Sequence, residues 1–274
     1  MINSLSDKKI AIIGSGKMGE TLASRMLDTG VVKANQLIAT DKNSSRLTYM
    51  KSTYGVKTTA NNREAAEQVD IILLCLKPQV AASIVAGFED AVHTNQLVIS
   101  IMASATSTLI EQYFSGNIPV MRAMPNTPCQ VGAGMTALAA GKFASESHYQ
   151  IAEDIFGAVG RTLRIEEKYF DAVTGLSASG PAFIYVVIEA LAEGGVKDGL
   201  SRDIATQLAS QMTLGAAKMV IETGNHPAIL KDHVTTPAGC TIDGLLKLEE
   251  GGLRVTLIKA VNEATKRAKA LVND

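Results

Sequence analysis

The sequence predicts an α/β protein in which a domain of alternating strands and helices is followed by an all-helical domain. Two observations lead to this fold class. Short apolar runs alternate with helix-type patterns through the first half of the chain, which is typical of a parallel sheet with right-handed crossovers. Beyond about residue 165 the strand patterns end and long helices follow. We therefore predict domains at residues 1–165 and 166–274.

The strands of the first domain are expected at short, continuous apolar runs. Ile10–Ile13 ends at a glycine, which suits a strand that is buried on both faces. Val69–Leu76 is the strongest such run and is stopped by Pro78. The other expected strands are Leu37–Thr40, Val56–Thr58, Leu97–Met102, Val120–Ala123 and two edge strands, Met135–Ala139 and Arg161–Ile165.

Helices are expected where apolar residues recur at helical spacing. Met18–Asp28 has such a pattern, and Gly30 is a plausible C-terminal cap. Pro181–Glu193 is apolar on nearly every side, so it must be buried on most sides, and we infer burial between subunits of a homo-oligomer. The other expected helices are Asn62–Gln68, Val80–Phe88, Thr108–Tyr113, Glu146–Val159, Ile204–Glu222, Thr241–Glu250, Leu253–Leu271 and a short one before Thr235.

Composition argues against several classes of protein. The chain has 274 residues, of which 46% are hydrophobic, and its net charge of −1 does not suit a general nucleic-acid binder. The first nine residues lack an apolar core, and no apolar run approaches the ~20 residues of a membrane span. Cys75, Cys129 and Cys240 are scattered without metal-ligand spacing. We therefore expect a cytoplasmic protein with no metal, nucleic-acid or membrane partner.

The motif Gly14–Gly19 follows the first strand and opens the first helix. This is the context in which G-x-G-x-x-G forms a phosphate cradle, so the first domain is predicted to be a Rossmann-type dinucleotide-binding domain. Gly14 permits the tight turn, Gly16 lets the backbone approach a pyrophosphate, and Gly19 allows close packing of helix and strand. The alternative is a glycine-rich turn without a ligand.

Asp41 is expected to lie beside the adenosine ribose, at the end of the second strand. A carboxylate there accepts from a ribose 2′-hydroxyl and favours NAD. Thr40, Lys42 and Arg46 would instead surround the 2′-phosphate of NADP, unless the two cations belong to a solvated loop. The residues alone leave the choice between NAD and NADP open.

Three turns and one later loop are further candidates for the site. The segments Cys75–Pro78, Ile101–Ser104 and Arg122–Pro128 follow strands, where ligands of parallel sheets bind. The loop His226–Thr241 places small residues at a helix start, where free N–H groups suit a carboxylate. Thr241 is either an N-cap of that helix or a substrate contact.

The sequence resembles the pyrroline-5-carboxylate reductases nearly end to end. The resemblance lies in Gly14–Gly19, Leu76–Pro78, Arg122–Pro128, Thr174–Ala182 and the segment Pro227–Glu249. It implies reduction of the C=N bond of 1-pyrroline-5-carboxylate to L-proline, the last step of proline biosynthesis, with NADPH favoured and NADH as the alternative. It also implies a helical dimerisation domain and a dimer, with a pentamer of dimers as the larger assembly of many members.

The resemblance also assigns residues to the site. Backbone N–H groups at Thr236, Gly239, Cys240 and Thr241 would hold the substrate carboxylate, and the Thr241 hydroxyl would bind the ring nitrogen as the catalytic group. With the motif glycines included, the implied cofactor residues are Gly14, Ser15, Gly16, Lys17, Met18, Gly19, Thr40, Asp41, Lys42, Asn62, Leu76, Lys77, Pro78, Met102 and His233.

Several residues depart from the family's pattern. Asp41 stands where small uncharged residues are common, and Met102 and Ser104 replace smaller Ala and Gly. Ala178 and Ala238 replace glycines, the latter with consequences if its φ must be positive.

Two other functions are weighed against the reductase. A β-hydroxyacid dehydrogenase would carry a lysine on the long inter-domain helix, and Pro181–Glu193 has none, with Lys197 coming after two glycines. A non-catalytic nucleotide-binding paralogue is disfavoured because both the glycine motif and the Thr241 loop are intact.

Overall fold

The computed structural model describes residues 4–270. Their contacts group them into two compact units. One contains the chain up to Ala178 together with the C-terminal segment from Ala264, and the other is Ser179–Glu263. The contacts thus place residues 166–178 with the first unit, and the boundary after residue 165 stays a prediction.

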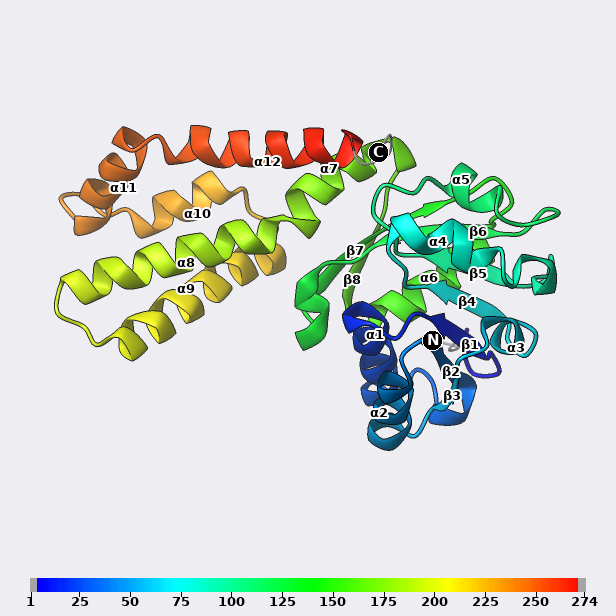
Figure 1. The fold of residues 1–274 in the computed structure, drawn as a ribbon. Helices are drawn as coiled ribbons and strands as arrows, with labels where there is room; N and C mark the ends of the chain where they lie inside the picture. Colours follow the sequence, from blue (N-terminus) through cyan, green and yellow to red (C-terminus); the bar gives the residue numbers. More distant parts are fainter. Residues whose placement is uncertain (1–3, 271–274) are drawn as a thin grey trace. The chain divides into compact units, whose positions relative to one another are not determined.

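The first unit is built on one eight-stranded sheet with the order β3-β2-β1-β4-β5-β6-β7-β8 (Figure 1). All eight predicted strands are present, and the predicted fold class is confirmed. Their bounds are β1 Ile10–Ile13, β2 Leu37–Thr40, β3 Lys57–Thr59, β4 Ile71–Leu74, β5 Leu97–Ser100, β6 Val120–Met124, β7 Gly134–Ala140 and β8 Gly160–Arg164.

One pairing departs from the prediction. Strand β7 runs antiparallel to β6, whereas the other neighbours in the sheet are parallel. The connection from β6 to β7 is a short 3-10 helix, Thr127–Val131, and a parallel return would need a crossover of about a dozen residues. Strand β7 also lies inside the sheet, so its predicted edge position is wrong, and β8 is at the edge.

Helices cover both faces of this sheet. Leu22 of α1, Met50 of α2 and Phe156 of α6 pack into the core on one face. Ala65 of α3, Val85 of α4 and Ile110 of α5 pack into the core on the other. The helix bounds are α1 Lys17–Asp28, α2 Ser44–Tyr54, α3 Asn62–Ala66, α4 Pro78–Val85, α5 Ser107–Glu111, α6 Glu146–Gly157 and α7 Phe170–Val173, and a π-helical turn, Thr174–Ala178, follows.

The helix α2 was not predicted. Met50 is its one buried residue, and its polar and β-branched side chains give no apolar stripe. The capping residues at its two ends were the feature of the sequence that could have predicted this helix. The Asn43 side chain accepts from the Ser45 N–H, and Gly55 ends the helix in the left-handed region with φ of 68°.

The second unit is helical. Helix α8 continues through its two glycines to Lys197, beyond the predicted end at Glu193, so Lys197 lies on this helix, exposed at its last residue. A Cβ on Gly195 would lie 3.2 Å from the Ala205 Cβ, so the small residues let α8 and α9 approach closely. The bounds are α8 Gly180–Lys197, α9 Arg202–Thr223, α10 Pro227–Val234, α11 Cys240–Glu250 and α12 Leu253–Ala270, whose end from Ala264 belongs to the first unit. The predicted terminal residue Leu271 lies outside the described residues.

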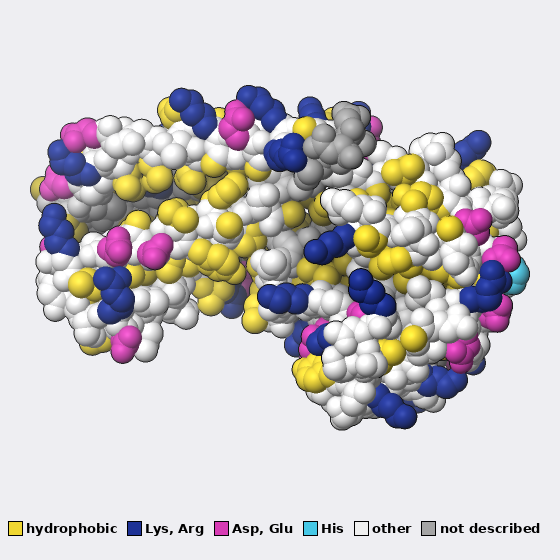
Figure 2. Space-filling view, viewed as in Figure 1, with side chains coloured by type: hydrophobic (Ala, Val, Ile, Leu, Met, Phe, Trp, Pro, Cys, Tyr) yellow, Lys and Arg dark blue, Asp and Glu magenta, His cyan; other side chains and the backbone are white. Residues whose placement is uncertain are grey.

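Little of the second unit is buried within one chain. Among its described residues only Ala192, Ala205 and Ala209 are buried, while Val186 is 64% exposed. Apolar side chains are visible along its helices in Figure 2. By length and composition, one helical stretch among the described residues, Glu167–Lys197, is also apolar enough to cross a membrane. A helix buried between two subunits has the same composition.

Candidate active site

The glycine cradle has the geometry that a dinucleotide pyrophosphate requires. Gly14 has φ of +98°, and a Cβ there would lie 2.7 Å from the Cys75 carbonyl oxygen. A Cβ on Gly19 would lie 2.2 Å from the Gly14 carbonyl oxygen. In contrast, a Cβ on Gly16 would meet nothing within 4 Å. Two glycines are therefore required by the fold, and Gly16 leaves open space beside the start of α1, where a phosphate would bind.

Ser15 links the cradle to the residues at the end of β2. Its side chain is buried, and its hydroxyl donates to the Thr40 carbonyl at 3.0 Å. Its backbone N–H donates to Asp41 Oδ2 at 3.2 Å. The N-cap Gly16 offers no side-chain acceptor to α1, so the N–H groups at the beginning of the helix are the ones available to a phosphate.

The residues predicted at the ribose end lie together at the end of β2. The Asp41 carboxylate also accepts from the Asn43 N–H at 2.9 Å. The Thr40 hydroxyl donates to Asn62 Oδ1 at 2.6 Å, so this donor is already used. Lys42 is exposed and has no ion pair among the described residues. Of the two cations predicted to contact the 2′-phosphate, Arg46 is paired with Glu20, and Lys42 is the one without an ion pair among the described residues.

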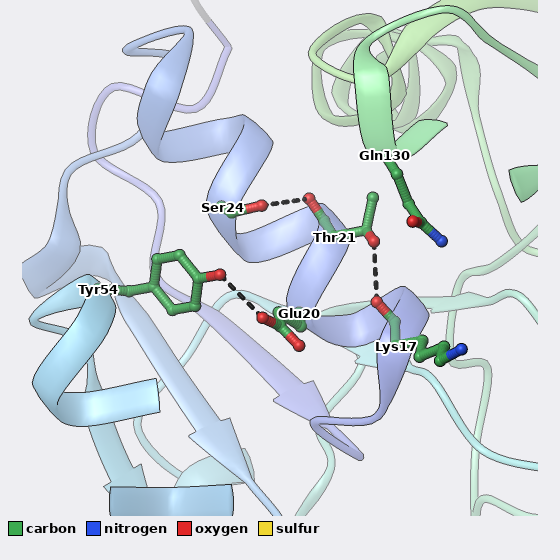
Figure 3. Close-up of a pocket in the computed structure, with 6 residues that line it drawn as sticks. All are labelled: Lys17, Glu20, Thr21, Ser24, Tyr54 and Gln130. Atoms are coloured by element: carbon green, nitrogen blue, oxygen red, sulfur yellow. Dashed lines mark hydrogen bonds between the residues drawn. The ribbon is translucent and has the colours of Figure 1, made fainter. Parts of the chain in front are cut away.

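A polar pocket of about 330 Å³ lies along α1 and is shown in Figure 3. Within it the Tyr54 hydroxyl donates to Glu20 Oε1 at 2.9 Å. The Thr21 hydroxyl donates to the Lys17 carbonyl at 2.8 Å. The Lys17 side chain lines this pocket, whereas its N–H belongs to the first turn of α1 beside the cradle.

The turn after β4 lies against the cradle. A Cβ on Gly14 would also lie 3.2 Å from Leu76 Cδ2. Lys77 is the N-cap of α4, and Pro78 occupies its first turn. Burial raises the pKa of the neighbouring Cys75 thiol to about 12, so this thiol stays protonated at neutral pH.

The turn after β5 contains Met102 and Ser104, two of the residues that depart from the family's pattern. The Met102 side chain is 1% exposed and packs in the core, so only its backbone can face a cofactor. Ser104 has φ of 64°, in the left-handed region that favours glycine. Its hydroxyl donates to the Ala268 carbonyl at 3.2 Å, near the end of α12. The serine therefore supplies a hydrogen bond to a helix end that the family's glycine would lack.

A partly buried ion pair holds the start of α5, which follows this turn, and was missed from the sequence. Arg122 Nη1 donates to Glu167 Oε1 at 3.1 Å, and Glu167 accepts from both the N–H and the hydroxyl of Ser107 at 2.6 Å. The Arg122 guanidinium also lies 4.5 Å from the centre of the Phe170 ring. Burial lowers the pKa of Arg122, and Glu167 opposes this shift. No local spacing links these residues, so sequence reasoning had no signal for them.

A second contact joins two of the motifs in the first unit. The Asn126 side-chain amide donates to the Ser177 carbonyl at 3.2 Å, and its oxygen accepts from the Met135 N–H at 3.0 Å. The segment that follows β6 thereby holds the π-helical turn in which Ser177 lies.

The predicted substrate loop precedes α11. The N-cap of this helix is Gly239, without a side-chain cap, and Thr241 lies one residue beyond the helix start. Thr241 is therefore not the N-cap, and its hydroxyl makes no hydrogen bond among the described residues. A Cβ on Gly239 would lie 2.4 Å from Thr236 Oγ1 and 3.1 Å from the Thr236 carbonyl oxygen, so a larger residue there would force the Thr236 side chain to move. Cys240 is exposed at the first helical position.

Ala238 has φ of 55°, so this position does favour the glycine that the family commonly has. An L-residue in the left-handed region costs about 1–2 kcal/mol. We predict that Ala238→Gly raises the free energy of unfolding by about 1 kcal/mol, because release of this strain exceeds the entropy gained by the unfolded chain. Denaturant unfolding measures it.

The matched control is Ala217→Gly, which introduces glycine at an exposed position in the middle of α9. We expect that change to lower the free energy of unfolding by about 1 kcal/mol. Equal destabilisation by both substitutions would contradict the strain at Ala238.

His233 lies in the last turn of α10 and lines an apolar cavity of about 370 Å³. The helical unit thus carries His233 and the loop from Thr236 to Thr241, and the first unit carries the other predicted cofactor residues. The other residues that line the cavity are Ala216, Met219, Val220, Pro227, Leu230, Lys231 and Val234.

Comparison with known proteins places this chain in a family. Residues 167–271 match the family profile described as pyrroline-5-carboxylate reductase dimerisation, and residues 9–104 match that of NADP oxidoreductase, coenzyme F420-dependent. The pyrroline-5-carboxylate reductase of Arabidopsis thaliana is 42% identical over 264 residues, covering 96% of this chain and 95% of that protein.

Solved structures agree with this. The pyrroline-5-carboxylate reductase of Coxiella burnetii has a TM-score of 0.91 and 35% identity, covering 96% of this chain and 98% of that one. The enzyme of Plasmodium falciparum, solved with NADP bound, has a TM-score of 0.87 and 30% identity, covering 97% and 99%. The chain belongs to the pyrroline-5-carboxylate reductase family.

Proposed function

We infer that this chain reduces 1-pyrroline-5-carboxylate to L-proline with a reduced nicotinamide dinucleotide, NADPH first and NADH as the alternative. The observation that carries this proposal is the intact cradle, in which Gly14 and Gly19 are sterically required and Gly16 faces open space. It occurs in a chain whose relatives of the same length are reductases of this substrate.

The reduced nicotinamide, when bound, supplies the hydride. The chain's own residues bind and orient the substrate. The N–H groups of Cys240 and Thr241 at the start of α11 suit the carboxylate, because they lack a side-chain cap and lie at the positive end of the helix dipole. The Gly239 N–H already donates to the Thr236 carbonyl at 3.0 Å. The free Thr241 hydroxyl would hold the ring nitrogen and pass or stabilise its proton. Fixing the ring in this way accounts for much of the rate gain.

The test is steady-state reduction of 1-pyrroline-5-carboxylate by NADPH and NADH side by side. Loss of reduced-nicotinamide absorbance that depends on the imine, with proline as the product, is the expected result. Nucleotide binding without turnover would contradict the proposal and would favour a non-catalytic paralogue.

Self-association belongs to the same proposal. The second unit buries three alanines within one chain, which is too little core for a stable domain, and most of its large apolar side chains remain exposed. A second copy of this unit supplies the missing apolar surface, in keeping with the dimerisation profile that it matches. We propose a dimer in the cytoplasm, with a pentamer of dimers as the larger assembly and no membrane or nucleic acid as partner.

Val186→Asp on α8 is expected to shift the protein from dimer to monomer and to lower its melting temperature, because a carboxylate would be buried in the interface. Light scattering after size-exclusion chromatography measures the mass. The same change at Val80 on α4, where the side chain is 42% exposed, should leave the mass unchanged. A Val186→Asp protein that stays dimeric would place the interface elsewhere.

A further inference from the structure

Arg46 contacts the phosphate loop itself. Its Nε donates to the Ser15 carbonyl at 2.8 Å, and its Nη2 donates to Glu20 Oε2 at 2.6 Å. The guanidinium carbon also lies 5.0 Å from the centre of the Tyr49 ring. One side chain of α2 thus joins the loop before α1 to the first turn of α1.

Glu20 holds Arg46 in this orientation. Its second oxygen accepts from the Tyr54 hydroxyl (Figure 3). Both carboxylate oxygens are therefore engaged. The Arg46 and Glu20 side chains are 29% and 24% exposed, so this ion pair is shielded more than most surface pairs. Burial alone would raise the pKa of Glu20, but the hydrogen bonds from Arg46 and Tyr54 lower it, so the carboxylate is charged at neutral pH.

Asp41 also binds Ser15, through the backbone N–H of that residue. Its Oδ2 accepts from the Ser15 N–H at 3.2 Å, while Arg46 occupies the Ser15 carbonyl. The side chains of Asp41 and Arg46, which both follow β2, therefore bind the N–H and the carbonyl oxygen of Ser15. The Arg46 guanidinium is committed to this bracing, whereas Lys42 is exposed and unpaired among the described residues.

We propose that Arg46, held by Glu20, positions the pyrophosphate loop through Ser15 and does not bind the 2′-phosphate of NADP, which leaves Lys42, a cofactor residue already implied by the family resemblance, as the cation for that phosphate. The proposal rests on the dinucleotide binding inferred above. It assigns the two cations that follow β2 to different parts of the cofactor. Arg46 is a positioning residue, and its effect on a nucleotide should depend on the pyrophosphate and not on the 2′-phosphate.

Two nucleotide fragments separate these roles. ADP has the pyrophosphate without a 2′-phosphate, and 2′-AMP has the 2′-phosphate without a pyrophosphate. We expect Arg46→Met to weaken ADP binding about tenfold, the usual scale of a lost hydrogen bond from a charged group, and to change 2′-AMP binding less than twofold. Lys42→Met, the matched control, should weaken 2′-AMP binding and spare ADP. Isothermal titration calorimetry on the full chain measures both.

Two more variants test the bracing itself. Arg46→Lys should not restore ADP binding, because an ammonium lacks the planar fork that reaches both the Ser15 carbonyl and Glu20. Glu20→Gln keeps Arg46 and weakens its anchor, so it should also weaken ADP binding and spare 2′-AMP. This variant keeps the proposal testable if Arg46→Met fails to fold.

Selective loss of 2′-AMP binding in Arg46→Met would overturn the proposal, because Arg46 would then bind the 2′-phosphate. Unchanged affinity for both fragments in Arg46→Met and Glu20→Gln would overturn it as well. Failure of the proposed function looks different, since the unmodified chain would then bind ADP and not reduce 1-pyrroline-5-carboxylate.

Discussion

Thr241→Ala is expected to lower kcat for the reduction of 1-pyrroline-5-carboxylate about 10²-fold, the usual scale for one positioned proton donor or hydrogen-bond donor. The dissociation constant of NADPH should stay within about twofold of its original value, because the loop that carries Thr241 is proposed to bind the substrate and not the nucleotide. The structure supports this role, since the hydroxyl is neither an N-cap nor engaged elsewhere among the described residues. Steady-state kinetics and nucleotide titration measure the two quantities.

Thr235 is the matched control for this substitution. Its hydroxyl already donates to the Lys231 carbonyl at 2.8 Å, so Thr235→Ala removes a structural hydrogen bond six residues earlier. That variant should lose a little stability and keep most of its turnover. Unchanged kcat in Thr241→Ala would refute the catalytic role of Thr241.

Gly16→Ala is expected to weaken NADPH binding about 10–100-fold while leaving the melting temperature unchanged. Gly16 has φ of −68°, which alanine adopts readily, and the added Cβ meets no protein atom within 4 Å. The methyl group would instead occupy the space beside the first turn of α1 that the pyrophosphate needs. Nucleotide titration and thermal unfolding measure the two effects.

Gly19→Ala provides the contrast. Its Cβ would lie 2.2 Å from the Gly14 carbonyl oxygen, so we expect both the melting temperature and nucleotide binding to fall. If Gly16→Ala bound NADPH as tightly as the original chain, the pyrophosphate would not lie over this glycine, and the cradle would be assigned wrongly.

The main features of the fold could be predicted because they depend on patterns of neighbouring residues in the sequence. Continuous apolar runs such as Ile10–Ile13 and Ile71–Leu74 mark strands buried on both faces. The glycine motif is recognisable because its spacing and context are local as well. Helix α2 was missed because Met50 is its one buried residue, so it lacks a periodic signal.

The contacts that support the candidate site could not be predicted in the same way. Glu20 and Arg46, or Arg122 and Glu167, are far apart in the sequence and meet only through the fold. Its positive charge alone suggested that Arg46 contacts the 2′-phosphate. In the structure its guanidinium instead donates hydrogen bonds to Ser15 and Glu20. The positive φ values at Ser104 and Ala238 had a sequence signal, since both replace glycines of the family's pattern.

The most direct test of the central claim follows the hydride itself. The chain is given 1-pyrroline-5-carboxylate and NADPH deuterated on the transferring face of nicotinamide C4, and the product is analysed by mass spectrometry and NMR. We predict L-proline that carries one deuterium at C5, since this chain is inferred to direct hydride to the carbon of the C=N bond. Proline without deuterium, or no proline while the nucleotide is bound, would contradict the account.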